Sequence, residues 1–146
     1  KDWKYWGTNM FNFDYLITFQ FIIFPKFYTV KDNENNEYVF LKTEAERINS
    51  LNLVKDKTQL EGYENHFHLF GKIRKRYQKK VEVVTNLILQ NLIKELRQNF
   101  PNKKFRVYLD CDFSDHVIIR FHQYWEDEHP YYNPDEFPSI TEFKIE

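Results

Sequence analysis

The residues best equipped for chemistry lie between Asp110 and His116, in the order Asp-Cys-Asp-Phe-Ser-Asp-His. Carboxylates grouped on one loop are able to hold a hard cation such as Ca²⁺ or Mg²⁺. A helix-loop-helix calcium site would also need a glycine at its sixth position and a closing glutamate, and this stretch lacks that glycine. Aspartate and serine are common in turns, because their side chains bond the local backbone. We therefore expect Asp110, Asp112 and Asp115 to form a turn, with a metal site as the alternative.

Cysteine and histidine offer two further candidates. Cys111 is the only cysteine and has His116 nearby, but no glycine-rich loop that could form an oxyanion hole accompanies the pair. His66 and His68 would share one face of a strand, and His122 would complete a zinc site if its strand lay beside them. The chain has only three glycines, which excludes glycine-rich nucleotide-binding motifs. The sequence therefore predicts no catalytic residue, no cofactor and no metal.

Positive charge is concentrated between residues 72 and 80, where Tyr77 lies among six basic residues. These are Lys72, Arg74, Lys75, Arg76, Lys79 and Lys80. Clustered cations neutralise phosphates and an aromatic ring stacks on a base, so one interpretation is a nucleic-acid-binding surface. The other is the solvated first turn of an amphipathic helix, although cations at that position oppose the helix dipole.

The C-terminal tail, residues 124–146, has the opposite charge and is rich in aromatic residues. The candidate partner-binding residues are Tyr124, Trp125, Glu126, Asp127, Glu128, Tyr131, Tyr132, Asp135 and Glu136. Aromatic anchors surrounded by carboxylates are suited to binding a basic protein, because the rings supply buried area and the charges steer the encounter. The alternative is that the tail folds back on its own basic run while its rings cover the core.

With the preceding segment Val117-Ile118-Ile119-Arg120-Phe121-His122-Gln123, the tail resembles the small bacterial immunity proteins that neutralise secreted or contact-delivered toxins. The resemblance implies a cytoplasmic, non-catalytic inhibitor whose carboxylates and aromatic rings block the substrate site of a basic nuclease toxin. The competing hypothesis is a nucleic-acid-binding protein or metal-dependent nuclease that uses the basic run and the Asp-rich loop.

Length and composition are those of one small domain. The 146 residues include 15 Phe, 10 Tyr and 3 Trp, which favours a sheet over a helical bundle, and the net charge is −1. A single cysteine is typical of a reducing compartment, and no secretory leader is visible at the start of the chain. The most apolar stretch, residues 11–24, contains too many polar residues to span a membrane.

The N-terminal half predicts a hairpin. Apolar residues alternate with polar ones from residue 11, which predicts a long strand over 11–24 that is stopped or bulged at Pro25 and continued over 27–30. A polar turn over 31–37 leads to a return strand over 38–41.

The rest of the chain predicts two helices and a second hairpin. We expect a helix over 44–51, a loop over 52–64, a weak strand over 66–70, a long amphipathic helix over 77–99, and strands over 105–109 and 117–121. Three prolines between residues 130 and 138 predict an irregular tail.

These elements define an α+β fold, with an antiparallel sheet of two hairpins and the long helix packed on one face. The expected organisation is a single domain with an N-terminal arm (1–10), a core (11–123) and the acidic aromatic tail (124–146).

Overall fold

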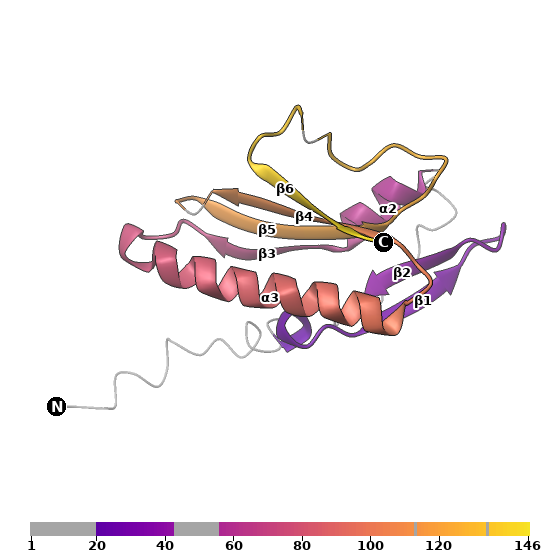
Figure 1. The fold of residues 1–146 in the computed structure, drawn as a ribbon, viewed down its shortest axis with the longest axis horizontal. Coiled ribbons are helices and arrows are strands. Elements are labelled where there is room, and N and C mark those ends of the chain that lie inside the picture. The colour runs from indigo at the N-terminus through magenta and orange to yellow at the C-terminus, as the bar shows by residue number, and fades with distance from the viewer. Residues whose placement is uncertain (1–19, 43–55, 113, 134) are drawn as a thin grey trace.

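A computed structural model describes residues 20–42, 56–112, 114–133 and 135–146. Its elements are β1 (Phe27–Lys31), β2 (Glu37–Leu41), α2 (Lys57–Glu64), β3 (His66–Gly71), the short 3₁₀ helix η2 (Lys75–Tyr77), α3 (Gln78–Asn99), β4 (Phe105–Asp112), β5 (His116–Gln123) and β6 (Ile140–Ile145). β1 and β2 form one antiparallel sheet, and a second has the order β3-β5-β4-β6 (Figure 1). The predicted α+β class, with two hairpins and one long helix, is confirmed.

The β1–β2 hairpin is built by its turn chemistry. The Asp32 carboxylate accepts hydrogen bonds from the backbone N–H groups of Glu34 and Asn36, and Asn35 has a φ of 65°. Aspartate and asparagine tolerate such turns because their side chains replace missing backbone partners. The predicted strand over 27–30, the turn and the return strand are therefore confirmed.

The prediction of a long strand over residues 11–24 is wrong at residues 20–24. Residues 20–23 are helical, and the Phe24 N–H donates to the Gln20 carbonyl. The alternation has already ended here, because residues 21–24 are all apolar, and the Asn91 side chain donates to the Ile23 carbonyl and satisfies it. Residues 11–19 of that strand, the arm over 1–10 and the predicted helix over 44–51 lie outside the described residues.

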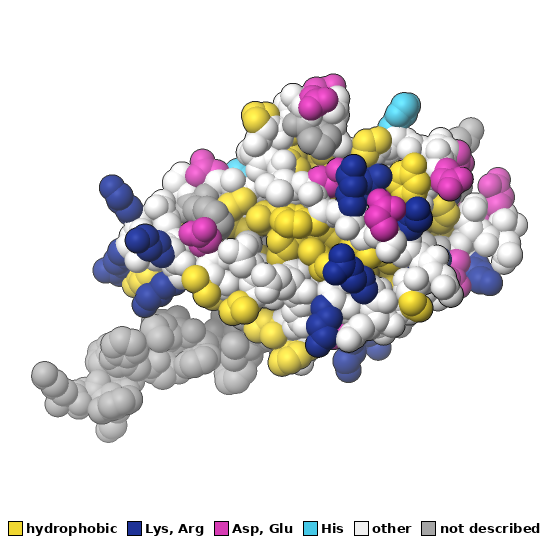
Figure 2. Space-filling model, in the orientation of Figure 1, with side chains coloured by type: hydrophobic (Ala, Val, Ile, Leu, Met, Phe, Trp, Pro, Cys, Tyr) yellow, Lys and Arg dark blue, Asp and Glu magenta, His cyan; other side chains and the backbone are white. Residues whose placement is uncertain are grey.

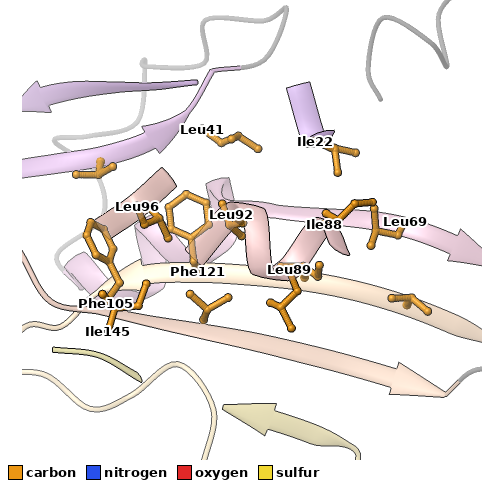
Figure 3. Close-up of a cluster of buried hydrophobic side chains, with 14 of the residues drawn as sticks. Ile22, Leu41, Leu69, Ile88, Leu89, Leu92, Leu96, Phe105, Phe121 and Ile145 are labelled. Carbon is orange, nitrogen blue, oxygen red and sulfur yellow. The ribbon is translucent and has the colours of Figure 1, made fainter. Parts of the chain in front are cut away.

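The main core lies between α3 and one face of the four-stranded sheet. The apolar stripe of α3 buries Ile88, Leu92 and Leu96 against the sheet, where Phe105 and Phe121 face it (Figure 3). α3 is amphipathic, as the spacing of its apolar residues predicts. Within the described ranges, no helix is long and apolar enough to cross a membrane.

Two segments that were expected to be irregular form regular elements, one in the middle of the chain and one near its C-terminal end. Residues 57–64, expected to be loop, form α2, whose first turn is capped by the Asp56 carboxylate accepting from the Gln59 N–H at 2.8 Å. Residues 140–145, expected to be irregular, form β6 and pair with β4 from Phe105 to Asp110. Both stretches depend on tertiary partners, so local composition predicted them poorly.

Helix α2 closes the outer edge of β2. In an antiparallel pair, alternate residues turn their backbone groups away from the partner strand. The Val39 N–H donates to the Glu61 carboxylate at 2.7 Å. The Asn65 side chain accepts from the Leu41 N–H and donates to the Val39 carbonyl, both at 2.8 Å. Two side chains, one helical turn apart, therefore take the place of a neighbouring strand.

The same two residues also serve the end of β5, which extends beyond its pairing with β3. The Gln123 N–H donates to Glu61 at 2.7 Å, and the Phe121 N–H donates to the Asn65 carbonyl at 3.3 Å. Glu61 and Asn65 are 0% and 1% exposed, so these bonds lie in the interior. The two sheets are thus joined through polar groups of α2.

This arrangement predicts a strong effect of Asn65→Asp. The substitution replaces the amide that donates to Val39 with an oxygen, which leaves a buried carbonyl facing a carboxylate. We expect the free energy of unfolding to fall by about 2–4 kcal/mol in urea titrations. Asn102→Asp, on an exposed residue, is the matched control and should change stability by less than about 0.5 kcal/mol. Equal effects of the two variants would show that Asn65 does not bridge the sheets.

Candidate functional site

The face of the four-stranded sheet opposite α3 carries polar and aromatic side chains at alternate positions. Arg106 and Tyr108 lie on β4, and Arg120 and His122 lie on β5. The chain between β5 and β6 runs over this face, on the side away from α3 (Figure 1). The candidate tail therefore meets the sheet rather than the basic run at residues 72–80.

Two tyrosines of the tail stack on the sheet. The Arg120 guanidinium lies 4.1 Å from the ring centroid of Tyr131 and 5.6 Å from that of Tyr132. Tyr132 also makes an edge contact with Tyr108, with centroids 5.5 Å apart. A Cβ added to Gly62 on α2 would overlap the Tyr131 ring, so the glycine is what allows this close approach.

The start of the tail is held by α2. The Trp125 indole N–H donates to Glu61 at 3.2 Å, and the Lys57 ammonium lies 4.9 Å from the Trp125 ring. The Glu128 carboxylate accepts from the backbone N–H groups of Lys57 and Thr58 at 2.9 and 2.5 Å, where it complements the positive end of the helix. Asp127 pairs with Lys57 at 2.9 Å.

The remaining tail candidates face solvent. Glu126, Asp135 and Glu136 are exposed, and the carboxylate of Asp127 keeps 71% of its side-chain surface despite its ion pair. Tyr124 is 41% exposed and lies under the Arg106 guanidinium at 4.9 Å. Phe137, which the sequence did not single out, is 45% exposed. The structure thus divides the predicted residues into two groups. The docked residues are Trp125, Glu128, Tyr131 and Tyr132, and the exposed ones are Tyr124, Glu126, Asp127, Asp135 and Glu136.

A pocket of about 140 Å³ lies beneath the tail, between α2, β4 and β6. Its charged groups pair with one another, because Arg106 lies 3.6 Å from Glu142, and Lys144 lies 3.8 Å from the same carboxylate. Glu128 is engaged at the start of α2.

His122, at the bottom of this pocket, is 2% exposed. Its Nδ1 lies 2.6 Å from the Gln123 carbonyl, and its Nε2 lies 3.2 Å from the Tyr108 hydroxyl. Burial lowers the pKa of His122 to about 4, so the ring is neutral at physiological pH. His66 and His68 lie on β3 opposite Arg120 and Ile118, and the described residues contain no group of three potential ligands that could hold a metal ion.

The turn in the Asp-rich stretch is shorter than predicted, because Asp110 and Asp112 lie in β4 and His116 lies in β5. The Asp112 carboxylate accepts from the Ser114 N–H at 2.8 Å, and His116 lies 3.2 Å from both Asp110 and Asp115. Burial raises the pKa of the Cys111 thiol to about 11, which disfavours the thiolate that nucleophilic catalysis requires. The structure therefore gives no support to a Cys111–His116 pair as a nucleophile and base.

The six residues of the basic run are all exposed. They lie in the segment between β3 and η2, in η2 and in the first turn of α3, at the end of the molecule where Figure 2 shows one group of Lys and Arg side chains. The acidic tail therefore does not cover them.

Sequence reasoning missed Glu61, Asn65 and Gly62, which position the tail. Glu61 and Gly62 lie in α2 and Asn65 caps its C-terminal end, and the sequence contains a local signal for this helix. Asp56 precedes Gln59 by three residues, the spacing of an N-cap with its N3 partner, and Leu60 follows as a buried residue. The burial of Glu61 has no sequence signature, because it depends on donors from two distant strands.

Comparisons with protein-family models, with curated proteins and with solved structures find no match for this chain.

Gly62→Ala should displace the tail. The added methyl group overlaps Tyr131, so we expect the free energy of unfolding to fall by about 1–3 kcal/mol and amides over 128–139 to exchange faster in hydrogen-exchange mass spectrometry. Alanine favours a helix interior, so any loss would arise from the overlap. Gly71→Ala, where no atom lies within 4 Å, is the control and should leave tail exchange unchanged. Unchanged exchange in Gly62→Ala would contradict the docking.

Glu61 and His122 should give opposite pH dependences of stability. Burial raises the pKa of Glu61 from 4.5 to about 7, so its contribution is present below pH 4.5 and lost as the pH rises to 7. The pKa of His122 falls from 6.5 to about 4, so its contribution is present above pH 6.5 and lost as the pH falls to 4. Between pH 4.5 and 6.5 the two effects oppose each other.

Urea titrations of single variants over this interval separate the two groups. Relative to the parent protein, Glu61→Gln should add a slope of stability that rises with pH by about 1.4 kcal/mol per unit. His122→Gln should add a slope of similar size that falls with pH. If both variants shift the slope in the same direction, the assigned pKa directions are wrong.

Proposed function

We propose that this protein is a non-catalytic, cytoplasmic binding module that contacts a positively charged protein through the exposed carboxylates of its tail. The interaction would be that of a bacterial immunity protein with a basic nuclease toxin. The observation that carries this proposal is that three aromatic rings of the tail are docked, namely Trp125, Tyr131 and Tyr132, while three of its carboxylates are exposed, namely Glu126, Asp135 and Glu136.

Docking of the tail supports a binding role because the tail is already held in place before a partner binds. Trp125, Tyr131 and Glu128 fix the tail at three points on α2 and the sheet. A surface held in one conformation loses less entropy on binding than a flexible arm does. The exposed rings of Tyr124 and Phe137 add apolar area beside the carboxylates, as interface anchors require.

Charge supports the choice of a basic partner. Between residues 126 and 136 the tail has five acidic residues and no Lys or Arg. Two of the five, Asp127 and Glu128, are partly neutralised by Lys57, whereas Glu126, Asp135 and Glu136 make no ion pair in the described part of the chain. Exposed charges of one sign accelerate encounter with an oppositely charged protein and make it sensitive to salt.

The test uses small basic toxin domains encoded by genes next to the gene for this chain. Biolayer interferometry at 150 mM NaCl should detect a tight complex, and the complex should suppress the toxin's nuclease activity. Glu126→Lys combined with Asp135→Lys should weaken binding at least tenfold, mainly through slower association.

The matched control is Glu34→Lys combined with Glu82→Lys, which makes the same change in net charge at exposed residues outside the tail. It should alter binding much less than the tail variant. Equal losses would attribute the effect to net charge alone, and unchanged binding by the tail variant would remove the tail from the interface.

A further inference from the structure

The six cations of the basic run are exposed and lie at one end of the molecule. Lys72 follows β3 with a φ of 51°, Lys75 and Arg76 lie in η2, and Lys79 and Lys80 lie in the first turn of α3. With Arg74, these residues and Tyr77 are called the basic surface below. Figure 2 shows the cations gathered at this end, where β3 leads into α3 in Figure 1.

Acidic side chains do not neutralise the basic surface. Among the described residues, none of its six cations lies within 4 Å of a carboxylate. The nearby hairpin contributes a backbone contact, from the Lys72 N–H to the Asp115 carbonyl at 2.6 Å, while the Asp115 carboxylate lies beside His116. The first acidic residue of α3 is Glu82, which lies beyond the first turn.

The position of these cations is unfavourable for folding. The start of α3 has no acidic residue in its first turn and no side-chain cap, so the positive end of the helix dipole adds to the positive side chains. Like charges at this end destabilise a helix. A bound polyanion would relieve this repulsion, because its phosphate groups complement the positive side chains.

An aromatic ring stands within the basic surface. Tyr77 is 43% exposed, and the Arg76 guanidinium lies 4.6 Å from its ring centroid. Stacked planar groups of this kind bind the face of an unpaired base, which a duplex keeps covered. The ring therefore favours a single strand over a double helix.

We propose that the basic surface binds single-stranded nucleic acid, with phosphates on its Lys and Arg side chains and a base on Tyr77. This surface is separate from the acidic tail, so its test stands independently of the protein partner.

The experiment measures fluorescence anisotropy of labelled dT12 and U12 with the full chain at several NaCl concentrations from 50 to 200 mM. We expect binding whose logarithmic affinity falls linearly with the logarithm of salt, with a slope of about −2 to −4 for three to six phosphate contacts. Absence of binding at 50 mM NaCl would overturn the proposal.

Charge-reversal variants locate the binding. Lys75→Glu, Arg76→Glu and Lys79→Glu, combined in one protein, should reduce affinity at least a hundredfold. The combination of Lys26→Glu, Lys94→Glu and Arg97→Glu makes the same change in net charge at exposed residues elsewhere and should reduce it much less. Circular dichroism confirms that each protein is folded, and equal losses in the two proteins would contradict a localised surface.

The stacking contact has its own test. Tyr77→Ala should weaken binding about tenfold, whereas Tyr63→Ala, at a ring 61% exposed on α2, should leave it unchanged. Equally tight binding of a 12-base-pair duplex, of heparin or of anionic phospholipid vesicles would show a general affinity for polyanions and would overturn the assignment to single strands.

Discussion

The fold depends on one buried carboxylate that joins two sheets. Glu61 accepts hydrogen bonds from Val39 on β2, from the backbone and side chain of Gln123 on β5, and from the Trp125 indole. Burying a carboxylate is costly and raises the pKa of Glu61, and the N–H donors offset part of that cost. The donors come from β2, from the end of β5 and from the start of the tail, so one side chain of α2 holds these segments together.

Helix α2 therefore organises the candidate site. Its first turn receives Glu128, its middle accommodates Tyr131 at Gly62, and its buried face holds Trp125 through Glu61. The tail departs from this helix toward β6, which pairs with β4 and anchors the other end. The tail contains three prolines and little regular structure, so its conformation is set by these contacts rather than by a ladder of backbone hydrogen bonds within the tail.

Sequence reasoning succeeded where the signal is local. The 3.6-residue period gave α3, and β-branched runs around a polar turn gave the β4–β5 hairpin. It failed where the outcome depends on distant partners. The start of α2 has a local signal in its Asp56 cap, but the burial of Glu61 depends on donors from β2 and β5. Ile140–Ile145 becomes a strand by pairing with β4. For the tail, composition identified the exposed carboxylates but could not show that Tyr131 and Trp125 are used internally.

The same docking explains why the charges of the molecule remain segregated. An acidic tail and a basic run in one flexible chain would neutralise each other. Here Asp127 pairs with Lys57, and Glu128 accepts from the first N–H groups of α2. The tyrosine rings stack on Arg120, and these contacts hold the tail on the outer face of the sheet. Lys72 to Lys80 lie at the end where β3 meets α3 and make no ion pair among the described residues. The buried Glu61 thus has a consequence at the surface, since by holding Trp125 at the start of the tail it helps to keep the acidic side chains of the tail apart from the exposed cations of the basic run.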